Sequence, residues 1–167
     1  GRLTGSRLAE QRIVVHGAGA AGLGIARQLK AAMRLEGLSE AQCLERVAAL
    51  DSRGLIVADH EQTDAYKREL AWPTNLAHEL GLGPTADRGL ESVVRAFRPT
   101  VLVGTSGQRG CFTEDIVRAM ARSCERPVIL PFSNPSDLSE ALPEDLLRWT
   151  DGRALVATGS PFSPVDV

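Results

Sequence analysis

Apolar residues follow two alternating patterns along this chain: short unbroken runs, and longer segments in which they recur every three or four positions. The unbroken runs are typical of buried parallel strands and lie at residues 12–16, 47–51, 100–103, 128–130 and 154–157. The helical spacing predicts helices at residues 20–35, 40–46, 90–97 and 143–149, with another beginning after Thr113. Strands that alternate with helices indicate an open, doubly wound, mostly parallel sheet of the α/β class.

The pattern loosens between residues 59 and 88, where polar residues, prolines and glycines interrupt the apolar positions. A short helix near residues 76–80 is the only element predicted there, and the segment is interpreted as a loop-rich crossover. With 167 residues the chain is in the size range of one domain, and residues 1–167 are expected to form that domain.

Charge and composition narrow the classes of partner. The 19 basic and 21 acidic residues give a formal net charge of -2, which offers no broad electrostatic attraction for nucleic acid. No apolar run reaches the roughly eighteen residues that span a bilayer, so no membrane association is expected. The three cysteines are an odd number without a CxxC pair, which favours a reducing, cytoplasmic setting over a disulfide framework.

Residues 17–22 read Gly-Ala-Gly-Ala-Ala-Gly directly after the first predicted strand and at the start of a helix. This is the setting of the dinucleotide-binding motif in a Rossmann-type fold. The first glycine permits a tight turn, the second lets backbone approach a pyrophosphate, and the third lets helix and strand pack closely. Glycines also serve as plain turn formers, but the strand and helix around them favour the nucleotide interpretation.

In doubly wound sheets the ligand crevice lies at the carboxyl ends of the strands. This rule adds Asp51 and the segments 104–107 and 133–134 to the glycine motif. Asp51 comes later than the interval of about 20 residues typical of a ribose-binding carboxylate. An inserted helix at residues 39–46 explains the delay, and a plain turn over residues 51–54 is the alternative.

Several segments that follow one order along the chain resemble malic enzymes. They are residues 17–26 (GAGAAGLGIA), 51–56 (DSRGLI), 104–107 (GTSG), 112–113 (FT), 133–135 (SNP) and 157–162 (ATGSPF). The similarity extends over residues 8–167, and the last segment is far more specific than the glycine motif. The resemblance implies an NAD(P)-binding domain that serves the oxidation of malate at C2 and the loss of CO2, with pyruvate and reduced NAD(P) as products.

The resemblance also implies roles for individual residues. Those matching the pyrophosphate loop are Gly17, Ala18, Gly19 and Ala20, with Ala21 and Gly22 completing the motif, and those matching the loop beside the nicotinamide ribose are Gly104, Thr105 and Ser106. Asn134 matches an asparagine that hydrogen-bonds the substrate, a task that suits an uncharged amide with two donors and an acceptor. A turn-forming role of the Ser-Asn-Pro tripeptide is the alternative.

Part of the family's machinery is expected outside this chain. Malic enzymes use Mg or Mn held by carboxylates that precede the glycine motif, and a lysine and a tyrosine further upstream that transfer protons. Residues 1–16 precede the motif here, and Glu10 is the single carboxylate among them. We therefore expect a fragment of a longer, homo-oligomeric enzyme that does not turn over malate alone. The alternatives are a standalone dinucleotide-binding regulatory module and the cofactor domain of another amino- or hydroxy-acid dehydrogenase.

Two features give opposite indications for the cofactor. A carboxylate at the position of Asp51 accepts a hydrogen bond from the ribose 2′-hydroxyl of NAD and repels a 2′-phosphate. Lys67 stands at the distance where NADP-using malic enzymes carry a phosphate-binding lysine, and the small Ser52 leaves room for the phosphate. We predict NADP in preference to NAD, because charge-assisted bonds from Lys67 and Arg53 offset the repulsion. The alternative for Lys67 is a place in the solvated run of residues 67–69.

Other reactive residues are interpreted as structural. The histidines lack metal-ligand spacing, and His16, at the end of a buried strand, is assigned to packing. Cys111 has no histidine or aspartate placed in sequence to mark it as a nucleophile, and is also assigned to packing. For Arg109 the sequence does not distinguish between a side chain that faces solvent and one that faces the substrate.

Overall fold

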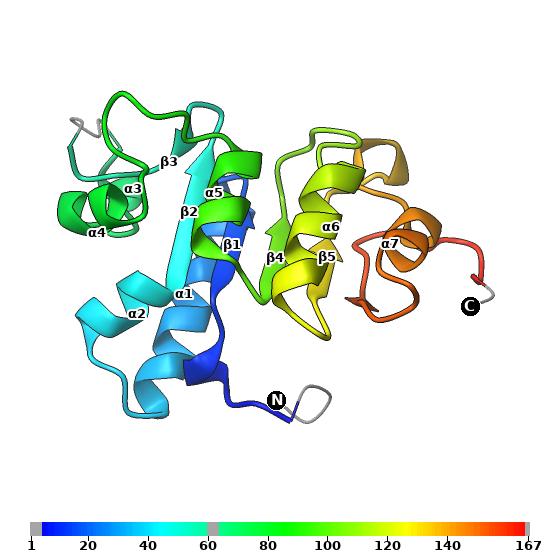
Figure 1. The fold of residues 1–167 in the computed structure, drawn as a ribbon, viewed down its shortest axis with the longest axis horizontal. Helices are drawn as coiled ribbons and strands as arrows, with labels where there is room; N and C mark the ends of the chain where they lie inside the picture. The colour runs from blue at the N-terminus through cyan, green and yellow to red at the C-terminus, as the bar shows by residue number, and fades with distance from the viewer. Residues whose placement is uncertain (1–4, 60–63, 166–167) are drawn as a thin grey trace.

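The computed structural model describes residues 5–59 and 64–165, and its strands form one six-stranded sheet with the order β3-β2-β1-β4-β5-β6 (Figure 1). The strands are β1 Ile13–His16, β2 Val47–Asp51, β3 Gly54–Leu55, β4 Val101–Gly104, β5 Val128–Pro131 and β6 Leu155–Val156. All neighbours pair in parallel except β3, which is antiparallel to β2. The predicted doubly wound, mostly parallel sheet is confirmed. Because β1 lies between β2 and β4, the strand order reverses there, at the point where such sheets bind ligands.

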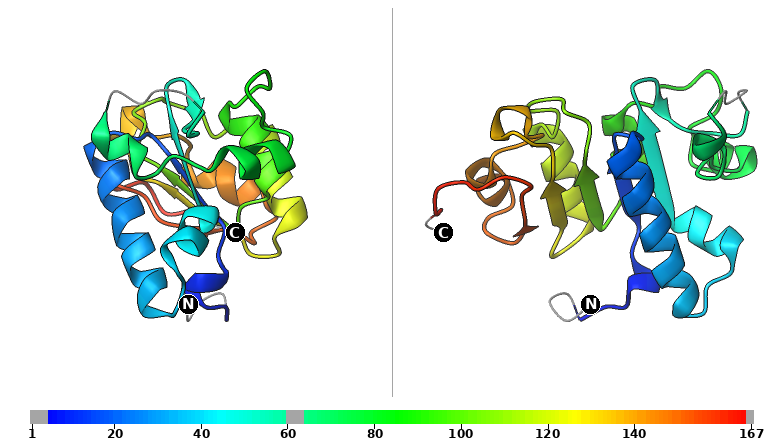
Figure 2. Two further views of the ribbon diagram at one scale, coloured as in Figure 1. Left: turned by 90° about the vertical axis from the view of Figure 1, so that its left-hand side faces the viewer. Right: turned by 180° about the vertical axis from the view of Figure 1, so that it is seen from behind.

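Helices cover both faces of the sheet. They are α1 Ala20–Leu35, α2 Glu40–Arg46, α3 Ala65–Arg68, α4 Thr74–Glu79, α5 Leu90–Phe97, α6 Glu114–Ser123 and α7 Pro143–Trp149, with short 3-10 helices at Leu8–Glu10 and Ser136–Leu138. Helix α1 packs on one face, while α5, α6 and α7 pack on the other, as the two views of Figure 2 show. Alternate strand residues face the two layers: Val14 lies in the core under α5 to α7, and Val15 lies in the core under α1. No helix in the described part of the chain is long and apolar enough to cross a membrane.

Local sequence signals explain several helix boundaries. Ser39 caps α2, since its hydroxyl accepts a hydrogen bond from the Gln42 backbone while the Gln42 side chain returns one to the Ser39 backbone. Gly37 follows the last turn of α1 with a φ of 100°, a conformation that glycine adopts without strain. Pro143 begins α7 at a position where no backbone N–H is needed. The predicted bounds of α1, α2, β2, α5 and α7 agree with the structure.

The segment that the sequence presents as a loop-rich crossover holds more structure than predicted. It contains α4, which corresponds to the short helix predicted near residues 76–80, and also α3, which was not predicted; the short strand β3, also not predicted, lies a few residues before it. Trp72 is fully buried there; its indole N–H donates to the carbonyl of Val47 at 2.8 Å, and its ring meets Phe97 edge-on, with centroids 4.9 Å apart. Arg88 forms a bidentate ion pair with Asp59, and both side chains are about nine-tenths buried. The crossover is thus packed into the main core through Trp72, and the ion pair of Lys67 with Asp51 holds α3 beside the end of β2.

Candidate functional site

A cleft of about 290 Å³ opens at the carboxyl edge of the sheet, around the ends of β1, β2 and β4. Its lining consists of His16, Gly17, Ala18, Gly19, Asp51, Ser52, Lys67, Thr105, Ser106 and Gln108. All of these except His16 and Gln108 are residues that the sequence predicts to bind the cofactor. The fold therefore gathers residues from four separate segments at the strand ends, where the crevice was expected.

The three glycines of the motif are required for different reasons. Gly17 has a φ of 112°, and a Cβ there would lie 2.5 Å from the carbonyl carbon of Thr105. A Cβ on Gly22 would lie 2.0 Å from the carbonyl oxygen of Gly17, so this position fixes how closely α1 packs against the glycine turn. A Cβ on Gly19 would meet no atom within 4 Å. Gly17 and Gly22 are thus needed by the protein itself, whereas Gly19 keeps space open at the cleft.

The glycine turn is bonded to the strands on both sides. The backbone N–H groups of Gly17 and Ala18 donate to the carbonyl of Leu50 on β2, at 2.9 and 3.0 Å. On the other side the Thr105 hydroxyl donates to the carbonyl of Gly17 at 2.8 Å. The N-cap of α1 is Gly19, which offers no side-chain cap, and Ala20 and Ala21 in the first turn are exposed. The N-terminus of this 16-residue helix is therefore open to an anion from the cleft.

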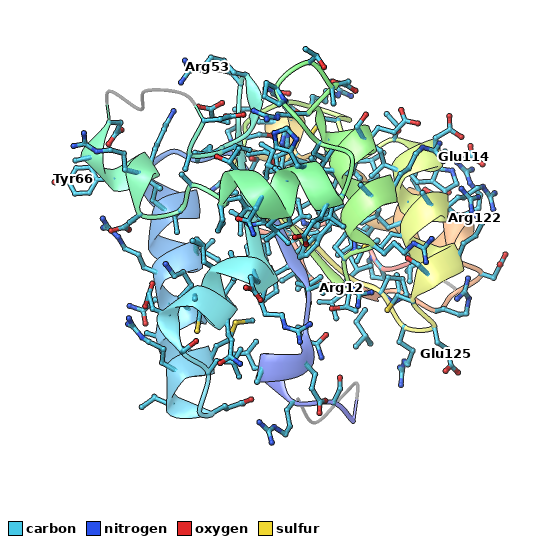
Figure 3. The ribbon with its side chains drawn as sticks, turned by 60° about the vertical axis from the view of Figure 1, so that its left-hand side comes forward. Arg12, Arg53, Tyr66, Glu114, Arg122 and Glu125 are labelled. Atoms are coloured by element: carbon cyan, nitrogen blue, oxygen red, sulfur yellow. The ribbon has the colours of Figure 1, made fainter. Side chains whose placement is uncertain are left out.

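Asp51 and Lys67 meet at the β2 end of the cleft. The Lys67 ammonium donates to Asp51 Oδ2 at 2.7 Å, and the Arg53 backbone N–H donates to Asp51 Oδ1 at 2.8 Å. Burial opposes ionisation of Asp51, but the bonds from Lys67 and Arg53 outweigh it and hold the pKa of this carboxyl below its usual range. Lys67 is thus a partner of Asp51 instead of a member of a solvated run. The Arg53 side chain is 69% exposed and does not line the cleft, and Figure 3 shows it at the periphery of the molecule.

A buried carboxylate that the sequence analysis did not single out joins the loops after β4 and β5. Glu140 is fully buried, and its Oε1 accepts hydrogen bonds from the Ser106 backbone at 2.8 Å, the Ser106 hydroxyl at 3.0 Å and the Ser133 hydroxyl. Its Oε2 accepts from the Ser133 backbone at 3.3 Å. A Cβ on Gly104 would lie 2.5 Å from the carboxyl carbon of Glu140. Gly104, which the sequence places with the cofactor-binding residues, therefore does not line the cleft and instead makes room for Glu140.

Asn134 lies outside this cleft, on the loop after β5. Its side-chain oxygen accepts a hydrogen bond from the Ser160 hydroxyl at 2.8 Å, and the residue is otherwise exposed. The bond joins the Ser-Asn-Pro segment to the segment 157–162, two strings that the sequence analysis noted separately. Within the described residues the amide N–H groups of Asn134 have no hydrogen-bond partner, so they are available to a ligand.

Cys111 and Arg109 lie beside the cleft and have different surroundings. Burial raises the pKa of Cys111 to about 11, so its thiol stays protonated at neutral pH, which agrees with the assignment to packing. Its sulfur lies 3.7 Å from the Ser106 hydroxyl. Arg109 lines a separate cavity of about 310 Å³, together with aromatic residues that include Phe112 and Trp149.

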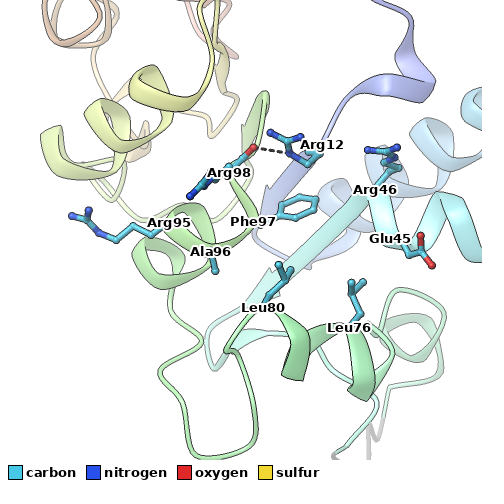
Figure 4. Close-up of a pocket in the computed structure, with 9 residues that line it drawn as sticks. All are labelled: Arg12, Glu45, Arg46, Leu76, Leu80, Arg95, Ala96, Phe97 and Arg98. Carbon is cyan, nitrogen blue, oxygen red and sulfur yellow. Dashed lines mark hydrogen bonds between the residues drawn. The ribbon is translucent and has the colours of Figure 1, made fainter.

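A larger cleft of about 670 Å³ lies at the opposite, amino edge of the sheet (Figure 4). It is lined by Arg12, Glu45, Arg46, Leu76, Leu80, Arg95, Ala96, Phe97 and Arg98. The Arg12 side chain donates to the carbonyl of Arg98 across it at 2.8 Å. None of the residues predicted to bind a cofactor lies in this cleft.

The strand order, the glycine turn, the open helix N-terminus and the carboxylate at the end of β2 define a Rossmann-type dinucleotide-binding domain. The family described as "Malic enzyme, NAD binding domain" matches residues 1–167, and the chain belongs to this family. The cofactor domain of another amino- or hydroxy-acid dehydrogenase is therefore not favoured.

Several relatives are enzymes much longer than this chain. A protein named NAD-dependent malic enzyme from Sodalis glossinidius is 50% identical over 164 residues, which cover 98% of this chain and 29% of the relative. One of the same name from Pseudomonas aeruginosa is 46% identical over 163 residues, again 98% of this chain and 29% of the relative. The crystal structure of NAD-dependent malic enzyme from Thermotoga maritima aligns with a TM-score of 0.64 at 25% identity, covering 95% of this chain and 35% of that one. The chain thus spans less than a third of the two relatives and about a third of the Thermotoga maritima enzyme.

Proposed function

We propose that this chain is the cofactor-binding domain of an enzyme that oxidises and decarboxylates malate to pyruvate and CO2, and that the carboxyl-edge cleft holds NAD. The observation that carries the proposal is the convergence at one cleft of the open N-terminus of α1, the free space over Gly19 and the ionised Asp51. These three features fit a pyrophosphate beside a ribose. Bound NAD would supply the two-electron oxidation of a hydroxyl-bearing carbon.

The proposed contacts follow from the positions of the residues. The glycine turn and the first turn of α1, which contains Ala20 and Ala21, bind the pyrophosphate through backbone N–H groups. Asp51 accepts a hydrogen bond from the adenosine ribose, with Ser52 beside it. Thr105 and Ser106 border the nicotinamide ribose. Asn134 donates to malate, its oxygen being held by Ser160.

NAD is proposed over NADP, which revises the expectation drawn from Lys67. Lys67 lies near Asp51 as that expectation requires, but its ammonium already pairs with this carboxylate at 2.7 Å. A 2′-phosphate would have to replace Asp51 as the partner of Lys67 and remain beside a second anion. The names of the relatives, which are NAD-dependent malic enzymes, support the same choice.

The remainder of the catalytic machinery is proposed to come from other parts of a longer protein. Within residues 5–59 and 64–165 no group of three His, Cys, Asp or Glu side chains is placed to hold a metal ion. We propose that the Mg or Mn ion is held by other residues of the longer protein. We propose that the 167-residue chain binds NAD without turning over malate, and that it serves in the cytoplasm. Homo-oligomeric assembly of the longer enzyme stays a prediction.

Calorimetric titration with NAD and NADP, alongside an absorbance assay for NADH formation from malate with Mg or Mn, tests this function. We expect NAD to bind more tightly than NADP and no malate turnover. Asp51→Asn should narrow the difference between the two cofactors, because it removes the repulsion of the 2′-phosphate; the exposed Asp115→Asn serves as a matched control. Tighter binding of NADP to the unmodified chain would restore the opposite preference, and rapid malate turnover would overturn the assignment of catalysis to other residues.

A further inference from the structure

His16 occupies an unusual position at the cleft. It is the last residue of β1, the residue is 8% exposed, and it lines the cleft together with Ser106 and Gln108. Neither ring nitrogen has a hydrogen-bond partner within the described residues. The ring lies near Phe112, with centroids 6.3 Å apart, and both of its nitrogens are covered by protein atoms at the wall of the cleft.

If His16 served only to pack the core, its unpartnered imidazole would lower the stability of the fold. A buried polar group without a partner loses its hydrogen bonds to water and gains none in return, so a leucine of similar size would be the more stable choice. Burial lowers the pKa of His16, although the Gln108 side chain and the charge of Glu140 oppose the shift, so the ring is neutral at pH 7. A neutral imidazole has one N–H donor and one acceptor, both of which suit hydroxyl and amide groups.

The position of His16 along the cleft indicates which part of a ligand it meets. Asp51, Ser52 and Lys67 form the β2 end of the cleft, and Thr105 and Ser106 form the β4 end. The carbonyl of His16 accepts the Thr105 N–H at 2.9 Å, which fixes the backbone of His16 beside the loop after β4. A dinucleotide with its adenosine at Asp51 and its pyrophosphate at Gly19 would extend its other half over His16.

We propose that His16 is a cofactor-binding residue that hydrogen-bonds the nicotinamide half of the dinucleotide, at its ribose hydroxyl or its carboxamide. Gln108, on the exposed loop after Gly107, borders the same cleft, and its side chain lies close enough to the imidazole to raise the pKa of His16. The inference rests on the proposed function, because it requires a dinucleotide in this cleft. It assigns to binding a residue that the sequence analysis assigned to packing.

Titration calorimetry of the 167-residue chain with NADH and with ADP separates the two halves of the ligand. His16→Leu should weaken NADH binding about tenfold, equivalent to about 1.4 kcal/mol, and leave ADP binding within twofold. The melting temperature of the ligand-free variant should be equal to or above that of the parent, because an unpartnered polar group has been removed. His16→Asn, which keeps a donor and an acceptor, should recover part of the NADH affinity, and the exposed Asp115→Asn outside the cleft should leave it unchanged.

ADP-ribose locates the contact. If His16→Leu weakens the binding of ADP-ribose as well as NADH, the hydrogen bond is to the ribose. If it weakens the binding of NADH alone, the hydrogen bond is to the carboxamide, and both results support the proposal. Unchanged NADH binding by His16→Leu would overturn it, and so would an equal loss with ADP, which would indicate a distorted glycine turn. If the parent chain binds neither NADH nor ADP, the proposed function itself fails, an outcome distinct from a selective failure of His16.

Discussion

The two clefts lie at opposite edges of one sheet and differ in how their walls are held. At the carboxyl edge, bonds between distant segments fix the wall: Thr105 to Gly17, Ser106 to Glu140, and Lys67 to Asp51. At the amino edge the Arg12 side chain bonds the backbone of Arg98, but Arg95 bonds back to Glu91 on its own helix, and the cleft is more than twice as large, at about 670 against 290 Å³. Volume and basic side chains are therefore poor guides to the cofactor site here. Converging backbone donors and a buried polar network distinguish it.

The strongest test of this contrast is a substitution that disrupts the close packing between α1 and the glycine turn. Gly22→Ala places a Cβ 2.0 Å from the carbonyl oxygen of Gly17, so α1 must move away from the turn. We expect a loss of about 3 kcal/mol or more in the free energy of unfolding, measured with urea, and a loss of NAD binding in calorimetry.

Gly24 gives a matched control on the same helix. A Cβ there meets no atom within 4 Å, so Gly24→Ala should stabilise the domain by about 0.5–1 kcal/mol through helix propensity and should not affect NAD affinity. Equal behaviour of the two alanine variants would contradict the packing role of Gly22.

A somewhat smaller effect is expected from the buried carboxylate at the carboxyl edge. Glu140→Gln turns one acceptor oxygen into a donor that faces the N–H and O–H donors of Ser106 and Ser133. We expect a destabilisation of about 2–3 kcal/mol in urea unfolding, together with weaker NADH binding, because the loop after β4 loses its anchor.

The exposed Glu144, in the first turn of α7, allows a control of the same chemistry. Glu144→Gln should change stability by less than about 0.5 kcal/mol and leave cofactor binding unchanged. If Glu140→Gln proved as mild, the network would not be what holds the two loops together.

Sequence patterns predicted the helices, and the position of the carboxyl-edge cleft, because these depend on residues that are close together in the sequence. Helix α5 has buried residues at Leu90, Val93, Val94 and Phe97, the spacing of one helical face, and its predicted bounds agree with the structure. The rule that ligands lie at the carboxyl ends of strands is sufficient to identify most of the cleft lining from the sequence. Both inferences need only the order of residues.

The parts that could not be predicted depend on partners far away in sequence. Trp72 is buried because it packs against Val47 and Phe97, and the spacing of apolar residues in 59–88 does not predict this burial. Glu140 follows Ser133 by seven residues and looks like an ordinary surface carboxylate in the sequence, yet it bonds the loop that contains Ser106. His16 was recognised as buried, but only coordinates reveal that its ring nitrogens are unpaired.

The smallest effect is expected at the amino-edge cleft, where the comparison predicts stability changes without changes in binding. Arg98 follows α5 with a φ of 51°, a left-handed conformation that costs a residue with a side chain about 1 kcal/mol and costs glycine little. Arg98→Gly removes a guanidinium from the cleft and relieves this strain. We therefore expect the free energy of unfolding in urea to rise by about 0.5–1 kcal/mol and the NAD affinity to stay within twofold of the parent.

Arg95→Gly, in the last turn of the same helix, removes the same charge at a right-handed position and should instead lower the free energy of unfolding by about 1 kcal/mol. A tenfold loss of NAD affinity in either variant would mean that the amino-edge arginines support the cofactor after all, and the distinction between the two edges would fail.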